Sequence, residues 1–125
     1  MPNAWLLARE LAFETVRAAK YQHLPSRLSC AFAFETLEDA NQYKNAFSRW
    51  NSTYEVELVD ASAPSHRAGF NLIQFPAANV EFLPVVVEWA ELYWRGEDIQ
   101  TPELLTKSAL RVKTLVSTGP ASYQP

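Results

Sequence analysis

The stretch LSCAFAFETLEDANQY (residues 28–43) places a strand directly before a helix. Its first seven residues are a short, mostly apolar run of small and aromatic side chains, which is typical of a strand. Thr36 then begins a capping-box pattern, with the acidic residue Asp39 three positions later. The stretch therefore predicts a strand over 28–34 and a helix that follows Thr36 and ends near Trp50.

The residues on either side of this stretch add further elements. Apolar side chains recur at helical spacing from an N-cap at Asn3 to about Tyr21, which predicts a first helix. The alternating run YEVELV (residues 54–59) gives the clearest strand prediction in the chain. We expect residues 60–69 to form a polar loop and residues 70–75 to form a short strand.

The last third of the chain predicts a helix and at least one strand. Apolar residues from Leu83 to Trp94 repeat at three- and four-residue steps, and Gly96 suits the end of that helix. Residues 101–112 fit either a helix or a strand, and the alternation over 110–116 favours a strand there.

This order of elements predicts a single α+β domain over residues 1–118 and a flexible C-terminal tail at 119–125. A length of 125 residues suits one domain. With 48% hydrophobic and 20% charged residues, the chain has an ordinary globular composition.

Charge and cysteine content exclude several classes of protein. Eleven Lys and Arg against fourteen Asp and Glu give a net charge of -3, which disfavours nucleic-acid binding. Cys30 is the only cysteine, and the two histidines have no metal-ligand spacing, so we expect neither a disulfide nor a metal site.

Residues 82–87, the longest apolar run, are too few to cross a bilayer. Without a signal-peptide pattern in residues 1–11, we expect a cytoplasmic protein that does not bind membranes.

Two places hold candidate functional residues, each with a structural alternative. Arg27 follows Ser26 just before the predicted strand, where a guanidinium can bind a phosphate; a solvated loop arginine is the alternative. Glu103 precedes two leucines and is either a carboxylate at the mouth of a cleft or a first-turn acid beside a helix dipole. Three other features fit structural roles better: Tyr93-Trp94 in the core, Cys30 as an unreactive buried thiol, and His66-Arg67 in a solvated loop.

Five short motifs also occur in a fixed order along the chain: RE-x-x-FE-x-x-R at 9–17, PSR at 25–27, F-x-TLEDA at 34–40, Y-x-VE at 54–57 and YW-x-G at 93–96. Over about residues 9–113, this order resembles a family of bacterial domains that are similar to ADP-ribosyltransferases of the small toxin and rifampicin-modifying type. The resemblance implies a split, mixed β-sheet with flanking helices that holds NAD in a central cleft.

The resemblance also implies roles for individual residues. Phe32, Phe34 and Tyr43 would line the nicotinamide side of the cleft, and Ser26 and Arg27 would contact the phosphates or the ribose. Glu103 would stabilise the positive charge that develops on the ribose as the nicotinamide bond breaks, with Arg27 as its catalytic partner.

Two functions follow from this resemblance. One is an NAD-dependent mono-ADP-ribosyltransferase-like protein, or an NAD glycohydrolase, in which ADP-ribose goes to a macromolecular target. The alternative is a catalytically inactive relative that binds a protein as an inhibitor, immunity or assembly module. The alternative rests on a predicted helix where the family has its first strand and on four Trp, five Tyr and seven Phe that could form an interface. A missing strand also suggests a homodimer.

Overall fold

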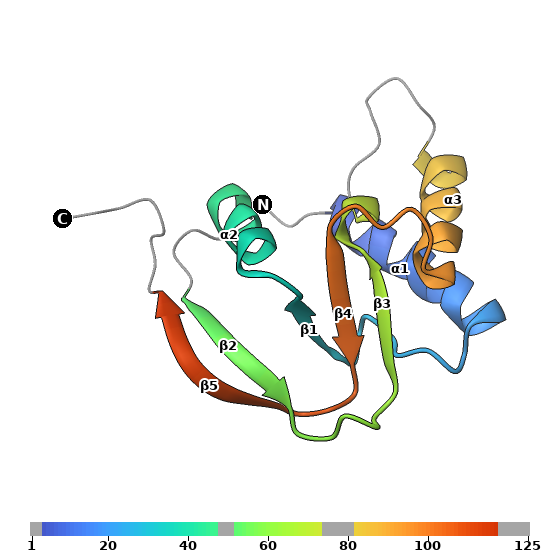
Figure 1. Ribbon diagram of the computed structural model, residues 1–125. Helices are drawn as coiled ribbons and strands as arrows, with labels where there is room; N and C mark the ends of the chain where they lie inside the picture. Colours follow the sequence, from blue (N-terminus) through green and yellow to red (C-terminus); the bar gives the residue numbers. More distant parts are fainter. Residues whose placement is uncertain (1–3, 48–51, 74–81, 118–125) are drawn as a thin grey trace.

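The computed structural model of the protein describes residues 4–47, 52–73 and 82–117 (Figure 1). In chain order the elements are α1 (Ala4–Lys20), β1 (Ala31–Phe34), α2 (Leu37–Phe47), β2 (Thr53–Leu58), β3 (Ser65–Gly69), the 3-10 turn η1 (Phe70–Leu72), α3 (Phe82–Arg95), β4 (Pro102–Thr106) and β5 (Leu110–Ser117). The predicted α+β class is therefore confirmed.

The strands form two sheets that are both antiparallel. One sheet has the order β1-β4-β3, and the other consists of β2 and β5. The mixed sheet that the resemblance implied is therefore wrong for the described strands, although the division into two sheets is present. The reason is that β2–β3 and β4–β5 run past each other in opposite directions as one long, bent ribbon (Figure 1).

Hydrogen bonds at the bend hold the two parts of this ribbon together. The Val59 N–H donates to the Ala109 carbonyl at 2.9 Å, and the Lys107 N–H donates to the Pro64 carbonyl at 2.9 Å. The Asp60 N–H donates to Ser108 Oγ, also at 2.9 Å. The corner thus keeps its backbone groups paired while the ribbon changes direction.

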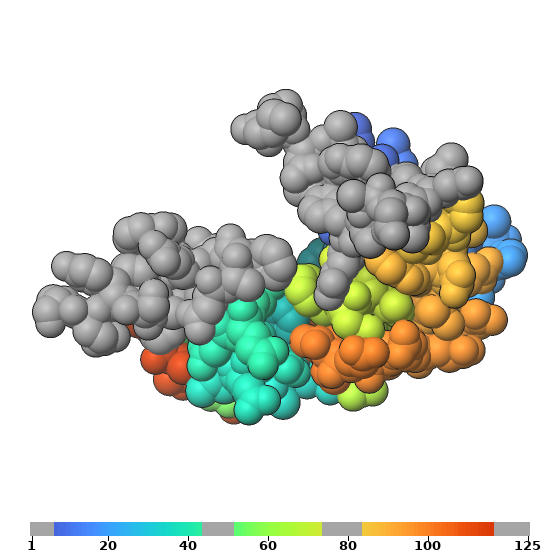
Figure 2. All heavy atoms as spheres, turned by 90° about the horizontal axis from the view of Figure 1, so that it is seen from above, coloured from blue at the N-terminus to red at the C-terminus, as the bar shows by residue number. Residues whose placement is uncertain are grey.

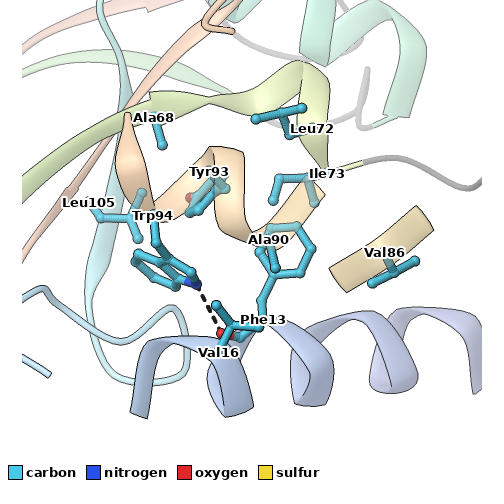
Figure 3. Close-up of a cluster of buried hydrophobic side chains, with 10 residues drawn as sticks. All are labelled: Phe13, Val16, Ala68, Leu72, Ile73, Val86, Ala90, Tyr93, Trp94 and Leu105. Atoms are coloured by element: carbon cyan, nitrogen blue, oxygen red, sulfur yellow. Dashed lines mark hydrogen bonds between the residues drawn. The ribbon is translucent and has the colours of Figure 1, made fainter. Parts of the chain in front are cut away.

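The hydrophobic core lies between the three-stranded sheet and the helices α1 and α3 (Figure 3). Its fully buried side chains include Phe13 of α1, Tyr93 and Trp94 of α3, and Leu105 of β4. Trp94 Nε1–H donates to the Phe13 carbonyl at 2.9 Å, so the indole contributes apolar area without leaving a buried donor unpaired. Each side chain of this size adds about 1.5–3 kcal/mol when buried.

Helix ends follow the signals that the sequence predicted. Thr36 Oγ1 accepts the Asp39 N–H at 3.1 Å, which is the expected N-cap of α2. Gly96, with φ of 71°, ends α3. Its N–H donates to the Tyr93 carbonyl at 3.1 Å and the Glu97 N–H donates to the Leu92 carbonyl at 3.0 Å, the bond pattern of a Schellman motif.

Three predictions about elements change. The expected loop at 60–69 holds over residues 60–64 but is wrong over the rest, because Ser65–Gly69 is strand β3 and pairs with β4 in register. The expected strand at 70–75 is also wrong over its described part, where Phe70–Leu72 is a 3-10 turn. The ambiguous residues 101–112 belong to strands β4 and β5 and to the corner between them. Tertiary pairing decides the first of these, since the sequence SHRAG has little strand propensity of its own.

Some expectations fall outside the described residues: the N-cap Asn3, the helix end near Trp50, and the tail at 119–125. None of the helices in residues 4–47, 52–73 and 82–117 combines the length and apolar character that crossing a bilayer requires.

Candidate functional site

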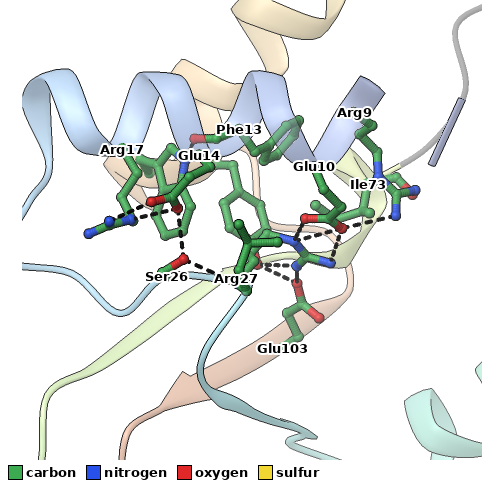
Figure 4. A network of polar contacts seen from close by, with 12 residues as sticks. Arg9, Glu10, Phe13, Glu14, Arg17, Ser26, Arg27, Ile73 and Glu103 are labelled. Atoms are coloured by element: carbon green, nitrogen blue, oxygen red, sulfur yellow. Dashed lines mark hydrogen bonds and ion pairs between the residues drawn. The ribbon is translucent and has the colours of Figure 1, made fainter. Parts of the chain in front are cut away.

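The structure places Arg27 and Glu103, 76 residues apart in sequence, in direct contact (Figure 4). Arg27 Nη1 donates to Glu103 Oε2 at 2.9 Å, and the two side chains are only 10% and 5% exposed. Arg27 lies in the turn before β1, and β4 carries Glu103 on the face that α1 and α3 cover. The two groups therefore meet each other inside the protein rather than across a cleft.

A second carboxylate also holds Arg27. Glu10, on α1, accepts from Arg27 Nε at 2.9 Å and from Arg27 Nη2 at 3.0 Å. Glu10 in turn forms an ion pair of 3.1 Å with Arg9, whose Nη1 donates to the Ile73 carbonyl at 3.4 Å. Two arginines and two glutamates thus balance in charge and connect α1, the turn before β1, and β4.

Tyr93 completes this network from α3. Its hydroxyl donates to Glu103 Oε2 at 2.5 Å and accepts from Arg27 Nη1 at 2.7 Å. Burial raises the pKa of Tyr93 well above its ordinary value, so the phenol keeps its proton and remains a donor. Glu103 Oε2 consequently accepts two hydrogen bonds.

The pKa values in the network follow from burial and charge pairing. Burial raises the pKa of Glu103, and the attraction of Arg27 offsets only part of that rise. Burial alone would raise the pKa of Glu10. The hydrogen bonds to Arg27 and the charges of Arg27 and Arg9 outweigh burial, so the pKa of Glu10 falls below its ordinary value. Burial lowers the pKa of Arg27, yet Tyr93 and the two carboxylates together raise it, and the guanidinium stays charged.

Ser26 also has structural partners. Its hydroxyl donates to Glu14 Oε1 at 2.7 Å and accepts the Leu28 N–H at 3.1 Å. Glu14 holds Arg17 through two bonds of 2.9 and 2.6 Å. Ser26 therefore connects the turn before β1 to α1, and its hydroxyl is engaged on both sides.

The aromatic candidates line a pocket of about 800 Å³. β1 and α2 form one side of this pocket, and the β2–β5 ribbon forms the other. Its lining consists of residues 32–37 and 52–58 together with Ala40, Tyr43, Leu104, Leu110 and Val116. Phe32, Phe34 and Tyr43 are thus together in the pocket, whereas Ser26, Arg27 and Glu103 are not among its lining residues. Seen from above, α2 lies between β5 and the half of the molecule that contains β3 and α3 (Figure 2).

Two of the lining residues, Phe34 and Tyr43, belong to an aromatic cluster with Phe70. The ring centroids of Phe34 and Tyr43 are 5.3 Å apart, and each ring lies 5.4 Å from Phe70. Two of these three contacts are edge-to-face, which is the favoured geometry for aromatic pairs. The cluster connects β1, α2 and η1.

The charged side chains of the pocket are all acidic. Among its described lining residues, Glu35, Glu55 and Glu57 carry charge and none is basic. Arg67 pairs with Glu35 at 2.6 Å and Arg111 with Glu57 at 3.4 Å. No ion pair in the described part of the chain includes Glu55.

These residues do not fit NAD. A dinucleotide carries two phosphates, which need cations or free backbone N–H groups. The pocket offers carboxylates instead, and Thr36 already caps the N-terminus of α2, whose first turn contains the acidic residues Glu38 and Asp39. Arg27 is buried and held by Glu10 and Glu103.

Sequence reasoning missed Glu10 and Tyr93 as partners of Arg27. Glu10 belongs to the RE motif at 9–10, but its role depends on a contact 17 residues away. For Tyr93 the sequence favours a place in the core and gives no sign of its bond to Arg27. Burial raises the pKa of Cys30 to about 11, which agrees with an unreactive thiol. The expected solvated loop at His66-Arg67 is wrong, because His66 is half-buried in β3 and stacks on Trp94.

Comparison with known proteins identifies a family whose function is unknown. A search of curated proteins found no match to the chain. The family described as a protein of unknown function (DUF2441) matches residues 3–117, nearly the whole chain, and the protein therefore belongs to the DUF2441 family.

Proposed function

We propose that this protein is a non-catalytic binding module that holds a partner polypeptide in the pocket between β1–α2 and the β2–β5 ribbon. One observation carries the proposal. The charged residues expected to do chemistry, Arg27 and Glu103, are buried and paired with each other, while the aromatic residues expected to bind line an accessible pocket to which neither charged residue contributes.

The buried pair is better suited to stability than to catalysis. A carboxylate that stabilises a developing positive charge must come close to the reacting atoms. Glu103 is 5% exposed, and a ligand would have to displace its bonds to Arg27 and Tyr93. Removing one partner from such a pair leaves the other charged group buried without compensation, which costs about 3–5 kcal/mol.

The pocket has the character of a recognition site. Its volume of about 800 Å³ lies in the range of known ligand sites. Apolar side chains remain accessible there: Phe32 is 40% exposed, Leu37 is 52% exposed and Tyr54 is 51% exposed. An apolar surface with a charged rim is typical of places where proteins bind other proteins.

A selection experiment tests the binding module. Wild-type protein would select binders from a displayed library of random peptides, and each binder would be measured against Ala40→Trp, which fills the pocket from α2. Ala19→Trp makes the same change on an exposed position of α1 and serves as the matched control. We expect peptides that bind wild type and Ala19→Trp but not Ala40→Trp, and a library without any pocket-dependent binder would contradict the proposal.

The NAD-dependent transferase is the second candidate. The acidic lining of the pocket does not suit a dinucleotide, but one geometric feature beside the pocket favours this function. The guanidinium carbon of Arg27 lies 4.8 Å from the ring centroid of Phe32, so three of the expected site residues, Arg27, Phe32 and Glu103, gather on one side of the β1–β4 pair. The test is NAD consumption by purified wild type and by Glu103→Gln, with a thermal-shift measurement in NAD. If wild type consumes NAD and a folded Glu103→Gln variant does not, the protein is an enzyme and the proposal of a non-catalytic binding module is wrong.

A further inference from the structure

The pocket lies between two strand edges that have no partner strand in the described residues. β1 is an outer strand of the order β1-β4-β3, so only β4 pairs with it. Among the described strands, β2 pairs with β5 alone, so its other edge has no partner strand there either. Figure 1 shows β2, rather than β5, as the strand of the ribbon nearer to β1.

The lining residues indicate that both edges face the pocket. Every residue from 32 to 36 and every residue from 52 to 58 contributes to the lining. Successive side chains of a strand point to opposite faces, so one face of a strand would supply only alternate residues. Unbroken runs are expected where the edge of a strand, with its unpaired backbone N–H and C=O groups, borders the space.

The side chains around these edges define what fits between them. Leu58, Leu104 and Leu110 give apolar contacts. Glu55 places negative charge beside β2, and Glu57 does so too, although Arg111 offsets part of its charge. Resting on the proposed function, we propose that the partner is an extended segment of alternating apolar and basic residues that inserts as a strand between β1 and β2. Such a strand would bond to both edges and join the two sheets into one.

A second folded copy of the chain does not suit this space. An inserted strand needs both of its edges free, whereas each of the five described strands already has a partner on one edge. β5 contains the basic residues Arg111 and Lys113 beside apolar ones, but it is paired with β2. The net charge of -3 also disfavours self-association at an acidic pocket.

The experiment uses the full chain and a defined probe. The probe is a fluorescein-labelled peptide in which Lys and Val alternate. Its length of about eight residues is typical of a strand. Binding is followed by fluorescence anisotropy. Two matched peptides accompany it. One replaces every Lys with Glu, and the other keeps the sequence but carries N-methyl groups at alternate positions, which removes half of its backbone donors.

We expect the Lys/Val peptide to bind and the Glu/Val peptide to bind at least about tenfold more weakly, since like charges oppose at the pocket. The N-methylated peptide should lose binding because it cannot pair with both edges. In the protein, Glu55→Lys should weaken binding about tenfold. Glu88→Lys, the same change on an exposed position of α3, should alter binding by less than about twofold.

Hydrogen exchange gives an independent readout of the inserted strand. The bound Lys/Val peptide should slow exchange of backbone amides within 32–36 and 52–58. Equal binding of the Glu/Val or the N-methylated peptide would overturn the inference, as would no binding by the Lys/Val peptide. If the library meanwhile yields pocket-dependent peptides of another type, the binding module stands and only the inserted basic strand fails.

Discussion

Arg27 is the residue on which most of the polar interior depends. Its guanidinium contacts Glu10, Tyr93 and Glu103, and its carbon lies 4.8 Å from the Phe32 ring centroid. These partners come from α1, α3, β4 and β1, so one side chain fixes how four elements meet. A planar guanidinium with five donors suits this task, and a lysine with its single ammonium would not replace it.

Replacing Arg27 with Met should therefore destabilise the protein by about 3–5 kcal/mol, because Glu10 and Glu103 would stay buried without their cation. Urea unfolding measures the free energy. Arg111→Met removes the exposed pair with Glu57 and should cost only about 0–1 kcal/mol. A loss at Arg27 no larger than the loss at Arg111 would show that the buried network contributes little to stability.

His66 predicts a pH dependence at the residue scale. Its Nε2 lies 2.8 Å from the Tyr93 carbonyl, so the neutral ring donates through that nitrogen. Burial lowers the pKa of His66, the nearby His23 lowers it further, and the bond to Tyr93 opposes both. The unfolded chain therefore binds this proton more readily, and stability should fall as pH drops from about 6.5 through the lower folded pKa.

The measurement compares unfolding free energies of wild type and His66→Gln between about pH 7.5 and pH 5. Glutamine can still donate to the Tyr93 carbonyl but does not titrate. Wild type should lose more stability than His66→Gln over this range. Parallel pH profiles for the two proteins would mean that His66 protonation does not oppose folding.

At the scale of elements, the helices carry their own termination signals and the strands do not. Thr36 caps α2, and Gly96 ends α3 with the left-handed backbone of a Schellman motif. Such signals act within a few residues, and the sequence alone predicted both. Strand β3 has no comparable signal, and only its register with β4 makes SHRAG a strand.

Gly96→Ala should destabilise the protein by about 1 kcal/mol, and Gly96→Asn by less, because asparagine tolerates a positive φ better than alanine. An added Cβ would lie 3.6 Å from the Arg67 carbonyl oxygen and 3.8 Å from His66 Cε1, which are ordinary contact distances. The cost therefore comes from the backbone conformation and not from a clash. Thermal unfolding of both variants checks this order, and a more stable Gly96→Ala would contradict it.

At the scale of the whole molecule, the two halves differ in how much they bury. The buried core consists of residues from α1, η1, α3, β3 and β4. Among the described side chains of α2, β2 and β5, none is buried. The half that borders the pocket thus has little apolar burial of its own, which agrees with a surface that gains stability when a partner binds.

Hydrogen exchange should show this difference in the free protein. Amides of β3 and β4 should exchange at least about tenfold more slowly than those of β2 and β5, because local opening of the ribbon needs less free energy than opening of the core. Mass spectrometry of peptic fragments measures both regions in one experiment. Equal protection of the two sheets would mean that the molecule opens as one cooperative unit.

Self-association stays a prediction at this scale. The exposed apolar side chains of β5 include Val112 and Leu115, and a homodimer through that edge would raise the mass measured in solution as concentration increases. A mass that stays monomeric across concentration would contradict a homodimer through β5.

The sequence by itself determined the α+β class, the three helices with the N-cap of α2 and the glycine end of α3, and the strands near 31–34 and 53–58, because these depend on periodicity and capping between neighbouring residues. Only the tertiary structure decided that 65–69 and 102–106 are paired strands and that the aromatic candidates face a pocket from which Arg27 and Glu103 are absent. Strand pairing and charge pairing join residues that are tens of positions apart in the chain. Because such contacts depend on both partners, the sequence around either one shows no local pattern that predicts them.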